Sequence, residues 1–291
     1  MPTPPSDHAR TPAPESRRPG PASEAHQASS ALEPHRARGI AESFGVDPDR
    51  YDRTRQPYPE ALVQRCIDQS PGTDVLDVGC GTGIAARQFQ VAGCRVLGLE
   101  PDSRMAAFAQ HRGLEVEVSM FEAWNPRGRS FDLIVAGTAW HWIDPAAGAV
   151  KAARVLRPGG RWAAFWHVWE APPTVHEAFA EAYTEAVPDS PFDPRALPGK
   201  AMDTYQVMCD TAADGIRQVD RFEEPEQWRF DWERFYTRDE YLDQLPTTGA
   251  LTRATADQVA HVLARVGAAI DALGGVFTTQ YTTVAVTAVA R

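Results

Sequence analysis

The sequence predicts an α/β fold built around a mostly parallel sheet, and three observations carry this prediction. The apolar run at residues 75–78 has the β-branched content of a buried parallel strand. Three glycines at alternate positions follow it, and a helix opening comes directly after them. A second apolar run, at residues 95–99, ends in Glu100. This order of strand, glycine turn, helix and strand predicts a ligand site at the carboxyl ends of the strands.

The glycine turn indicates which kind of ligand the site takes. Glycines let the backbone approach a ligand with no Cβ in the way, and a helix N-terminus offers free N–H groups. Glu100 lies about 20 residues beyond the first glycine, where an acid accepts hydrogen bonds from a ribose diol. The spacing Asp77-x-Gly79-x-Gly81-x-Gly83 differs from the dinucleotide fingerprint G-x-G-x-x-G.

This spacing closely resembles motif I of the class I S-adenosylmethionine-dependent methyltransferases of small molecules. The resemblance implies a Rossmann-like fold, S-adenosylmethionine as cofactor, and a seven-stranded, mostly parallel sheet with an antiparallel last strand. Specific motifs carry it over residues 51–168, and only the general architecture carries it beyond. A nucleotide-binding protein or a non-catalytic S-adenosylmethionine-binding protein is the alternative, although the cofactor motif shows no decay.

Composition limits the remaining choices. Residues 1–38 are rich in Pro, Ala, Ser and charge, and are predicted to be a disordered tail; residues 39–291 are predicted to form a single domain. The net charge of −10 disfavours a nucleic-acid substrate. No apolar run is long enough to span a membrane, and the four cysteines lack paired spacing. We therefore expect a cytoplasmic enzyme of small molecules, with no prediction of its oligomeric state.

The other elements follow from hydrophobic periodicity and from turn residues. Further strands are predicted at residues 114–118, 131–137, 161–170, 227–235 and 276–289. Further helices are predicted at residues 60–69, 106–111, 146–156, 237–245 and 256–273. The segment from 175 to 215 is predicted to be helical with proline breaks. The resemblance implies that a helical insertion at about 171–220 covers the pocket and sets substrate choice.

The resemblance implies roles for residues at the cofactor. A Tyr-rich segment before the glycine motif folds over the cofactor as a lid, and Tyr51 matches its position. Residues after the third strand hold the adenine ring, which Phe121 and Glu122 match. The predicted cofactor-binding residues are Asp77, Gly79, Gly81, Gly83, Glu100, Pro101, Phe121, Glu122, Thr138 and Tyr51.

Candidate substrate-binding residues are aromatic or basic. Arginines in the lid segment are placed to reach an anionic substrate, and the aromatic residues end the fourth strand or line the fifth. Core packing is the alternative for the tryptophans, and surface exposure for the arginines. The predicted substrate-binding residues are Tyr58, Arg53, Arg55, Trp140, Trp142, Trp166 and Trp169.

Two residues are candidate catalytic bases. Glu170 follows Trp169 and precedes Ala171-Pro172-Pro173, a setting predicted to desolvate the carboxylate and to raise its pKa. His141 is the alternative base. No set of His, Asp and Glu has metal-ligand spacing, so no protein-bound metal is predicted; Mg²⁺ would enter with a pyrophosphate substrate.

Two acceptor classes remain open. Methylation of an alkene carbon leaves a carbocation, which an aromatic wall stabilises and a base quenches. The aromatic residues and Glu170 resemble the prenyl pyrophosphate C-methyltransferases, which implies geranyl or farnesyl pyrophosphate as substrate. The motif order is also similar to the trans-aconitate methyltransferase group, which implies O-methylation of a small carboxylic acid without need of Glu170.

Overall fold

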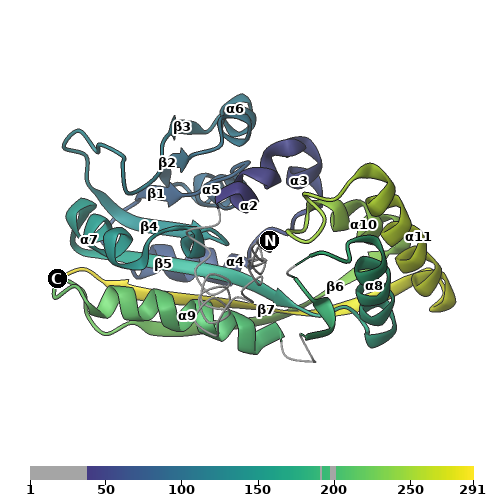
Figure 1. Cartoon of the computed structure of the whole chain (residues 1–291). Coiled ribbons are helices and arrows are strands. Elements are labelled where there is room, and N and C mark those ends of the chain that lie inside the picture. Colours follow the sequence, from purple (N-terminus) through teal and green to yellow (C-terminus); the bar gives the residue numbers. More distant parts are fainter. Residues whose placement is uncertain (1–37, 191, 197–200) are drawn as a thin grey trace, which may run out of the picture.

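The computed structural model describes residues 38–190, 192–196 and 201–291 (Figure 1). The predicted disordered tail therefore lies outside the described residues, except for Arg38. That residue opens a short helix, α2 (Arg38–Ala41), which continues into the 3-10 turn η2 (Glu42–Val46) and the helix α3 (Pro48–Thr54). No helix among the described residues is both long and apolar enough to cross a membrane.

The core is a seven-stranded sheet in the order β3-β2-β1-β4-β5-β7-β6. The first five strands in this order run parallel, and β7 is antiparallel to both β5 and β6. The predicted mostly parallel sheet with an antiparallel last strand is confirmed. The strands are β1 (Asp74–Val78), β2 (Arg95–Glu100), β3 (Glu115–Val118), β4 (Phe131–Gly137), β5 (Leu156–Trp169), β6 (Glu226–Thr237) and β7 (Val276–Val289).

Helices cover both faces of the sheet because alternate strand residues are apolar on each side. On one face, Val75 and Leu133 belong to the same buried cluster as residues of α4 (Glu60–Asp68), α5 (Ile84–Val91) and α6 (Ser103–His111). On the other face, Leu76 and Trp162 share a cluster with α7 (Pro145–Val155) and α9 (Ala201–Arg217). The carboxyl ends of the parallel strands stay open to a ligand between these layers.

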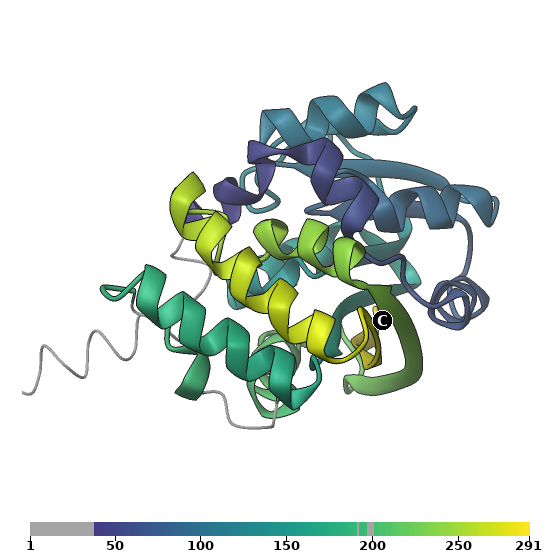
Figure 2. The same cartoon turned by 90° about the vertical axis from the view of Figure 1, so that its right-hand side faces the viewer.

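A third apolar cluster lies beyond the ends of the parallel strands. It joins α8 (Pro173–Ala186), α10 (Arg238–Gln244) and α11 (Ala256–Ala272) to the long strands β6 and β7. Figure 2 shows α8 and α11 running side by side at this end of the molecule. Val262, Val266 and Ile270 are fully buried there, at the helical spacing that predicted the last helix.

Several predicted boundaries differ in the structure, and β5 begins at Leu156 rather than at Arg161. The helix expected at residues 146–156 ends one residue earlier, because Leu156 already pairs with Phe131 as the first residue of β5. The segment expected to cover the pocket divides into α8 and α9, which pack in different places. The first packs against α11, whereas α9 packs against α7 and the sheet.

Candidate active site

A cavity of about 820 Å³ lies at the carboxyl ends of the parallel strands. This volume is near the upper end of the range for small-molecule sites, so the cavity has room for more than one ligand group. One side of it is formed by the turns after β1, β2, β3 and β4. The other side is formed by η2, α3, α9 and the segment between α10 and α11. The first side holds eight of the ten predicted cofactor residues, and Tyr51 of α3 lies on the other side.

The glycine turn forms a cradle in a conformation that disfavours other residues. Gly79, Gly81 and Gly83 have φ angles of +67°, +56° and +88°. A Cβ on Gly79 would lie 2.6 Å from the Cβ of Ala139, whereas a Cβ on Gly81 would meet open space. Gly81 lines the cavity, and Gly83 instead precedes α5 as its N-cap. The turn thus brings backbone to the ligand at Gly81.

Two buried acids lie beside the cradle. The side chain of Glu100 accepts the N–H groups of Gly81 and Asp102 at 2.8 and 2.9 Å. Burial raises the pKa of Glu100 to about 7. Burial also raises the pKa of Asp77 to about 7, and the Glu100 carboxylate adds to this effect. Oδ2 of Asp77 is buried without a hydrogen-bond partner.

These features fit S-adenosylmethionine. An orphaned carboxylate oxygen lining a cavity, with a raised pKa, marks a ligand-binding acid rather than a structural one. S-adenosylmethionine carries a sulfonium and an ammonium, which suit Asp77, and a ribose diol, which suits Glu100. Phe121 is 3 % exposed and lines the cavity beside Glu122, whose Oε1 accepts the N–H of Asp144 at 3.1 Å.

Nine of the ten predicted cofactor residues line the cavity, Gly83 being the exception. Thr138 follows β4 and lines the cavity, as Tyr58 does. It has a φ of +52°, and its Oγ1 is 3.0 Å from the hydroxyl of Tyr58. The Tyr58 ring stacks on His167 at a centroid distance of 4.5 Å, and burial raises its pKa. Tyr58 is thus held in place by its contacts with Thr138 and His167.

Aromatic rings also line the cavity, and three of them contact one another. The centroid of Phe44 lies 6.1 Å from that of Tyr51 and 6.4 Å from that of Trp142. Trp169 also lines the cavity and stacks on Tyr281 at 5.9 Å. Trp142, Trp169, Tyr51 and Tyr58 were predicted from the sequence; the cavity residues that sequence reasoning missed include Phe44, Tyr205, Met208, Thr248 and Gly249.

The two predicted arginines have different surroundings. Arg55 lines the cavity, its guanidinium lies 4.9 Å from the ring centroid of Tyr51, and its Nη2 donates to the carbonyl of Thr247. Nε of Arg55 is buried without a partner, and no carboxylate among the described residues pairs with this side chain. Arg53 does not line the cavity and instead forms ion pairs with Asp49 and Asp243.

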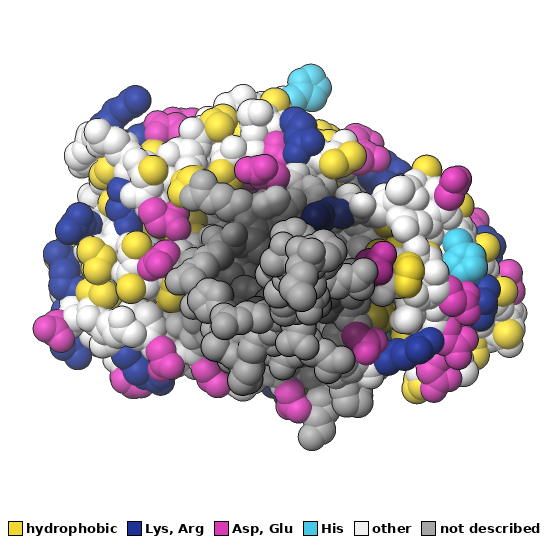
Figure 3. Space-filling model, viewed as in Figure 1, with side chains coloured by type: hydrophobic (Ala, Val, Ile, Leu, Met, Phe, Trp, Pro, Cys, Tyr) yellow, Lys and Arg dark blue, Asp and Glu magenta, His cyan; other side chains and the backbone are white. Residues whose placement is uncertain are grey.

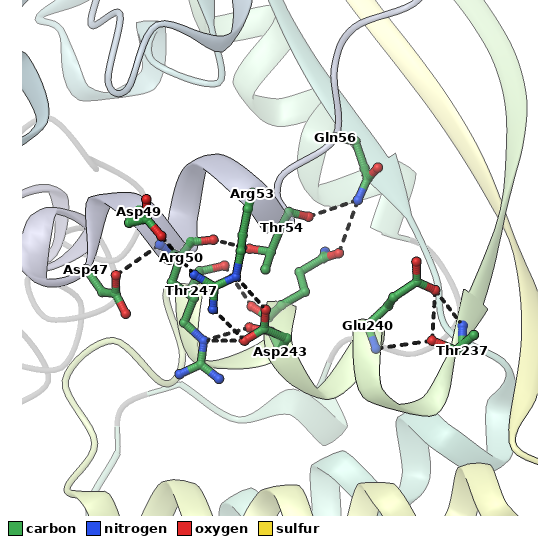
Figure 4. A network of polar contacts seen from close by, with 11 residues as sticks. Asp47, Asp49, Arg50, Arg53, Thr54, Gln56, Thr237, Glu240, Asp243 and Thr247 are labelled. Atoms are coloured by element: carbon green, nitrogen blue, oxygen red, sulfur yellow. Dashed lines mark hydrogen bonds and ion pairs between the residues drawn. The ribbon is translucent and has the colours of Figure 1, made fainter. Parts of the chain in front are cut away.

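The segment that carries Tyr51 and Arg55 is tied to α10. The carboxylate of Asp243 forms ion pairs with two arginines of α3 (Figure 4). Its oxygens lie 2.9 Å from Nε of Arg50 and 3.0 Å from Nε of Arg53. Just after α3, Nε2 of Gln56 donates a hydrogen bond to the backbone carbonyl of Thr54. The same atom lies 3.4 Å from Oε1 of Gln244 in α10. These contacts fix α3 and Arg55, which line the cavity, against the third cluster of the fold.

His141 follows β4 in the short turn η3 (Trp140–Trp142) and lines the cavity. Its Nδ1 accepts the indole N–H of Trp166 at 3.0 Å. Burial lowers the pKa of His141 to about 4, so the ring is neutral at pH 7. Trp140 and Trp166, predicted to bind substrate, are 2 % and 0 % exposed and belong to the core rather than to the cavity lining.

The predicted burial of Glu170 is wrong for this structure. Glu170 is exposed, its Oε1 accepts the N–H of Ala201 at 2.6 Å, and its carboxylate is not among the groups that line the cavity. The reason is that β5 ends at Trp169, so the chain leaves the sheet just before the acid. Trp169 lines the cavity, which places Glu170 directly beside its rim.

The sequence predicted no protein-bound metal, and its net charge disfavoured a nucleic-acid substrate. Acidic and basic side chains are interspersed on the face seen in Figure 3. Across the residues that the structure describes, no three His, Cys, Asp or Glu side chains are grouped to hold a metal ion. Mg²⁺ brought by a substrate stays a prediction.

The fold and this site define a class of protein. A parallel sheet with an antiparallel seventh strand, a glycine cradle after β1 and an acid at the tip of β2 are the parts of an S-adenosylmethionine-binding methyltransferase domain. Residues 75–160 match the family model described as a methyltransferase domain. The match covers residues 75–160, and the sheet around this segment has the fold of the class I S-adenosylmethionine-dependent methyltransferases.

Individual relatives agree with this assignment. An uncharacterized methyltransferase of Mycobacterium tuberculosis is 33% identical over 135 residues, which are 45% of this chain and 54% of that protein. A malonyl-[acyl-carrier protein] O-methyltransferase of Hahella chejuensis is 34% identical over 132 residues, which are 42% of this chain and 47% of that protein. The chain thus spans about half the length of these curated relatives.

Solved structures confirm the fold. A putative type II methyltransferase from Anaeromyxobacter dehalogenans superposes with a TM-score of 0.56 at 24% identity, covering 80% of this chain and 97% of that one. A putative methyltransferase from an antibiotic biosynthesis pathway of Anabaena variabilis gives a TM-score of 0.51 at 15% identity, covering 76% and 96%. At these identities the likeness concerns the fold alone.

Proposed function

We propose that this protein methylates an apolar small molecule that carries an anionic group. The observation that carries the proposal is Arg55, a cation that lines the cavity with no carboxylate partner among the described residues. A partly buried, unpaired charge is costly, so a ligand anion would compensate it. The rings of Phe44, Tyr51, Trp142 and Trp169 supply an apolar wall for the rest of the acceptor.

Bound S-adenosylmethionine supplies an electrophilic methyl group on a sulfonium. The protein then has to hold the acceptor in line with that group and exclude water. Asp77, Glu100 and the turn at Gly81 would hold the cofactor. The aromatic wall and Arg55 would hold the acceptor. The hydroxyls of Tyr58 and Thr138 are hydrogen-bonded to each other, and these two residues would lie between the cofactor and the acceptor.

The finer proposal is C-methylation of a prenyl pyrophosphate. The alkene π electrons would form the new carbon–carbon bond to the methyl carbon as the bond from that carbon to sulfur breaks. S-adenosylhomocysteine would leave, and a carbocation would remain on the acceptor. Loss of a proton from the adjacent carbon to a base then restores the double bond. The wall formed by Trp142, Trp169 and Tyr51 suits the cation, since each aromatic face contributes about 0.5–2 kcal/mol. Arg55 suits the pyrophosphate. The sequence resembles the geranyl pyrophosphate C6-methyltransferase of benzastatin biosynthesis in this respect.

Glu170 is the base in this finer proposal. In the structure its carboxylate is exposed beside the cavity rim, held by the N–H of Ala201. Proton removal from an acceptor carbon therefore requires the side chain to leave Ala201 and turn toward the cavity. A Glu170→Gln variant keeps an oxygen for that hydrogen bond and loses only the base.

O-methylation of a carboxylic acid is the second candidate. A carboxylate is already nucleophilic, so it needs no base, which agrees with the position of Glu170 outside the cavity lining. Relatives from Hahella chejuensis and Acetivibrio thermocellus are named malonyl-[acyl-carrier protein] O-methyltransferases. Arg55 would pair with the acceptor carboxylate in this case.

A turnover screen with methyl-labelled S-adenosylmethionine tests both candidates. Geranyl and farnesyl pyrophosphate are offered with Mg²⁺ and with a chelator, beside a panel of small and medium-chain carboxylic acids. Methyl on a prenyl carbon, lost with the chelator, supports C-methylation, and methyl esters support the second candidate. Tight cofactor binding by calorimetry with no turnover of any acceptor contradicts the proposed function and favours a non-catalytic binding protein.

A further inference from the structure

Trp166 contacts the only histidine that lines the cavity among the described residues. Trp166 lies in β5, on the face covered by α7 and α9, and is fully buried. Its indole N–H donates to Nδ1 of His141 at 3.0 Å. No described residue is hydrogen-bonded to the other ring nitrogen, Nε2, and this atom is absent from the buried unpartnered groups. His141 thus joins a buried tryptophan on one side to the open cavity on the other.

The chemistry of the indole restricts the state of the imidazole. An indole N–H only donates, so Nδ1 has to accept with its lone pair. A neutral imidazole carries one hydrogen, which must then lie on Nε2. Protonation of Nδ1 would set two N–H groups against each other at 3.0 Å, in addition to the cost of burying a charge. His141 consequently offers a donor, and not a lone pair, to the cavity.

We propose that Trp166 is a positioning residue that fixes the Nε2–H tautomer of His141, which donates a hydrogen bond to an oxyanion of the bound acceptor. The expectation that His141 acts as a general base is replaced by this binding role. The proposal deepens the proposed function and rests on it only for the identity of the acceptor. The shared ligand chemistry is an anionic oxygen, from a phosphate or from a carboxylate.

The chain offers a matched control in the same strand. Trp162 lies on the same face of β5, is also fully buried, and its indole N–H has no partner. Trp162→Phe therefore removes the same atoms as Trp166→Phe without touching His141. Thermal melts and S-adenosylmethionine affinity of both variants report whether the fold and the cofactor site remain intact.

The tautomer is measured directly by two-bond ¹H–¹⁵N correlation NMR of protein labelled on histidine, with His141→Gln to assign the signals. Wild type and Trp162→Phe should show a hydrogen on Nε2 and a bare Nδ1, unchanged between pH 5.5 and 8.5. Trp166→Phe should show a mixture of tautomers. A hydrogen on Nδ1 in the wild type, or an unchanged tautomer in Trp166→Phe, overturns the proposal. This measurement needs no active acceptor, so it stands even if the proposed function fails.

Ligand binding distinguishes the two anion sources. Inorganic pyrophosphate and octanoate are added separately to the labelled protein saturated with S-adenosylmethionine, and the Nε2–H signal of His141 is followed. A shift with pyrophosphate alone indicates a phosphate oxygen, and a shift with octanoate alone indicates a carboxylate. No shift with either, nor with any acceptor that the turnover screen identifies, contradicts the donor role.

Kinetics with an identified acceptor separate a donor from a base. Trp166→Phe is expected to raise KM about tenfold with a smaller change in kcat, while Trp162→Phe stays near wild type. His141→Gln retains an N–H donor and should keep more activity than His141→Phe. Equal loss of kcat in both His141 variants, with KM unchanged, would establish a base role and reject the proposal.

Discussion

Oε2 of Glu100 accepts the backbone N–H of Gly81 at 2.8 Å, which joins the tip of β2 to the turn after β1. The bond places a buried acid and a glycine with a free face on the same wall of the cavity. The acid recognises hydroxyls and the glycine allows close approach, so the cofactor site depends on both positions together.

Gly81→Ala should abolish cofactor binding without unfolding the protein. The new Cβ meets no protein atom and projects into space that the ligand needs. The φ of +56° adds a strain of about 1–2 kcal/mol. Gly93→Ala is the matched control, because Gly93 has a φ of +91° and open surroundings but is exposed away from the cavity.

Calorimetry with S-adenosylmethionine and urea unfolding measure the two effects. We expect similar losses of stability in both variants and at least a roughly tenfold loss of affinity only in Gly81→Ala. Equal affinities in the two variants would show that the cofactor does not approach Gly81.

Asp77→Asn should change how stability depends on pH. The folded protein raises the pKa of Asp77 from 3.8 to about 7. Between these values the folded state binds more protons than the unfolded state, so the free energy of unfolding falls as pH rises. Asparagine does not titrate, and it has nearly the same shape as aspartate, so it fits the same buried position.

The measurement is urea unfolding of cofactor-free protein at pH 5 and pH 8. Wild type should lose more stability than Asp77→Asn over this interval, by a difference on the order of 1–3 kcal/mol. A parallel pH dependence in the two proteins would mean that Asp77 is already ionised in the fold.

Arg55→Gln should weaken acceptor binding and spare the cofactor. The variant removes the cation that lines the cavity, so KM for an anionic acceptor should rise at least about tenfold with S-adenosylmethionine affinity unchanged. Arg53→Gln is the control, since Arg53 lies outside the cavity lining and only pairs with exposed or half-buried acids. Equal KM in both variants would remove Arg55 from the acceptor site.

Glu170→Gln separates the two acceptor classes. If Glu170 removes a proton from carbon, kcat should fall by about 10²–10⁴ in the variant. If the acceptor is a carboxylate, kcat should stay within a few-fold of wild type. Glu177→Gln, in the exposed face of α8, controls for the loss of one negative charge. Full C-methylation by Glu170→Gln would contradict the base assignment.

Much of the fold was predictable because its signals are local. The apolar runs of β1 and β2, the glycines between them and Glu100 lie within a short stretch, where local strand preference and turn chemistry act directly. The helix α11 was predictable for the same reason, from its apolar spacing. The acceptor wall was only partly predictable, because Phe44, Tyr205 and Thr248 come from distant segments and meet through packing of α3, α9 and α10.

The aromatic residues show where sequence reasoning stops. Trp140 and Trp142 are two residues apart, yet Trp140 is buried in the core and Trp142 lines the cavity. Likewise, Trp166 is buried in the core and Trp169 lines the cavity. The composition of a strand gives no information on which ring faces a ligand, because core and pocket both select large apolar side chains.

The sequence alone determined the cofactor class, since a glycine cradle and an acid at the tip of the next strand are set by neighbouring residues. The tertiary structure decided the acceptor side. It placed Arg55 in the cavity and Arg53 in ion pairs, left Glu170 exposed, and set Trp166 behind His141. The physical reason is that burial, pairing and tautomeric state depend on contacts between segments far apart in the chain, which no local pattern records.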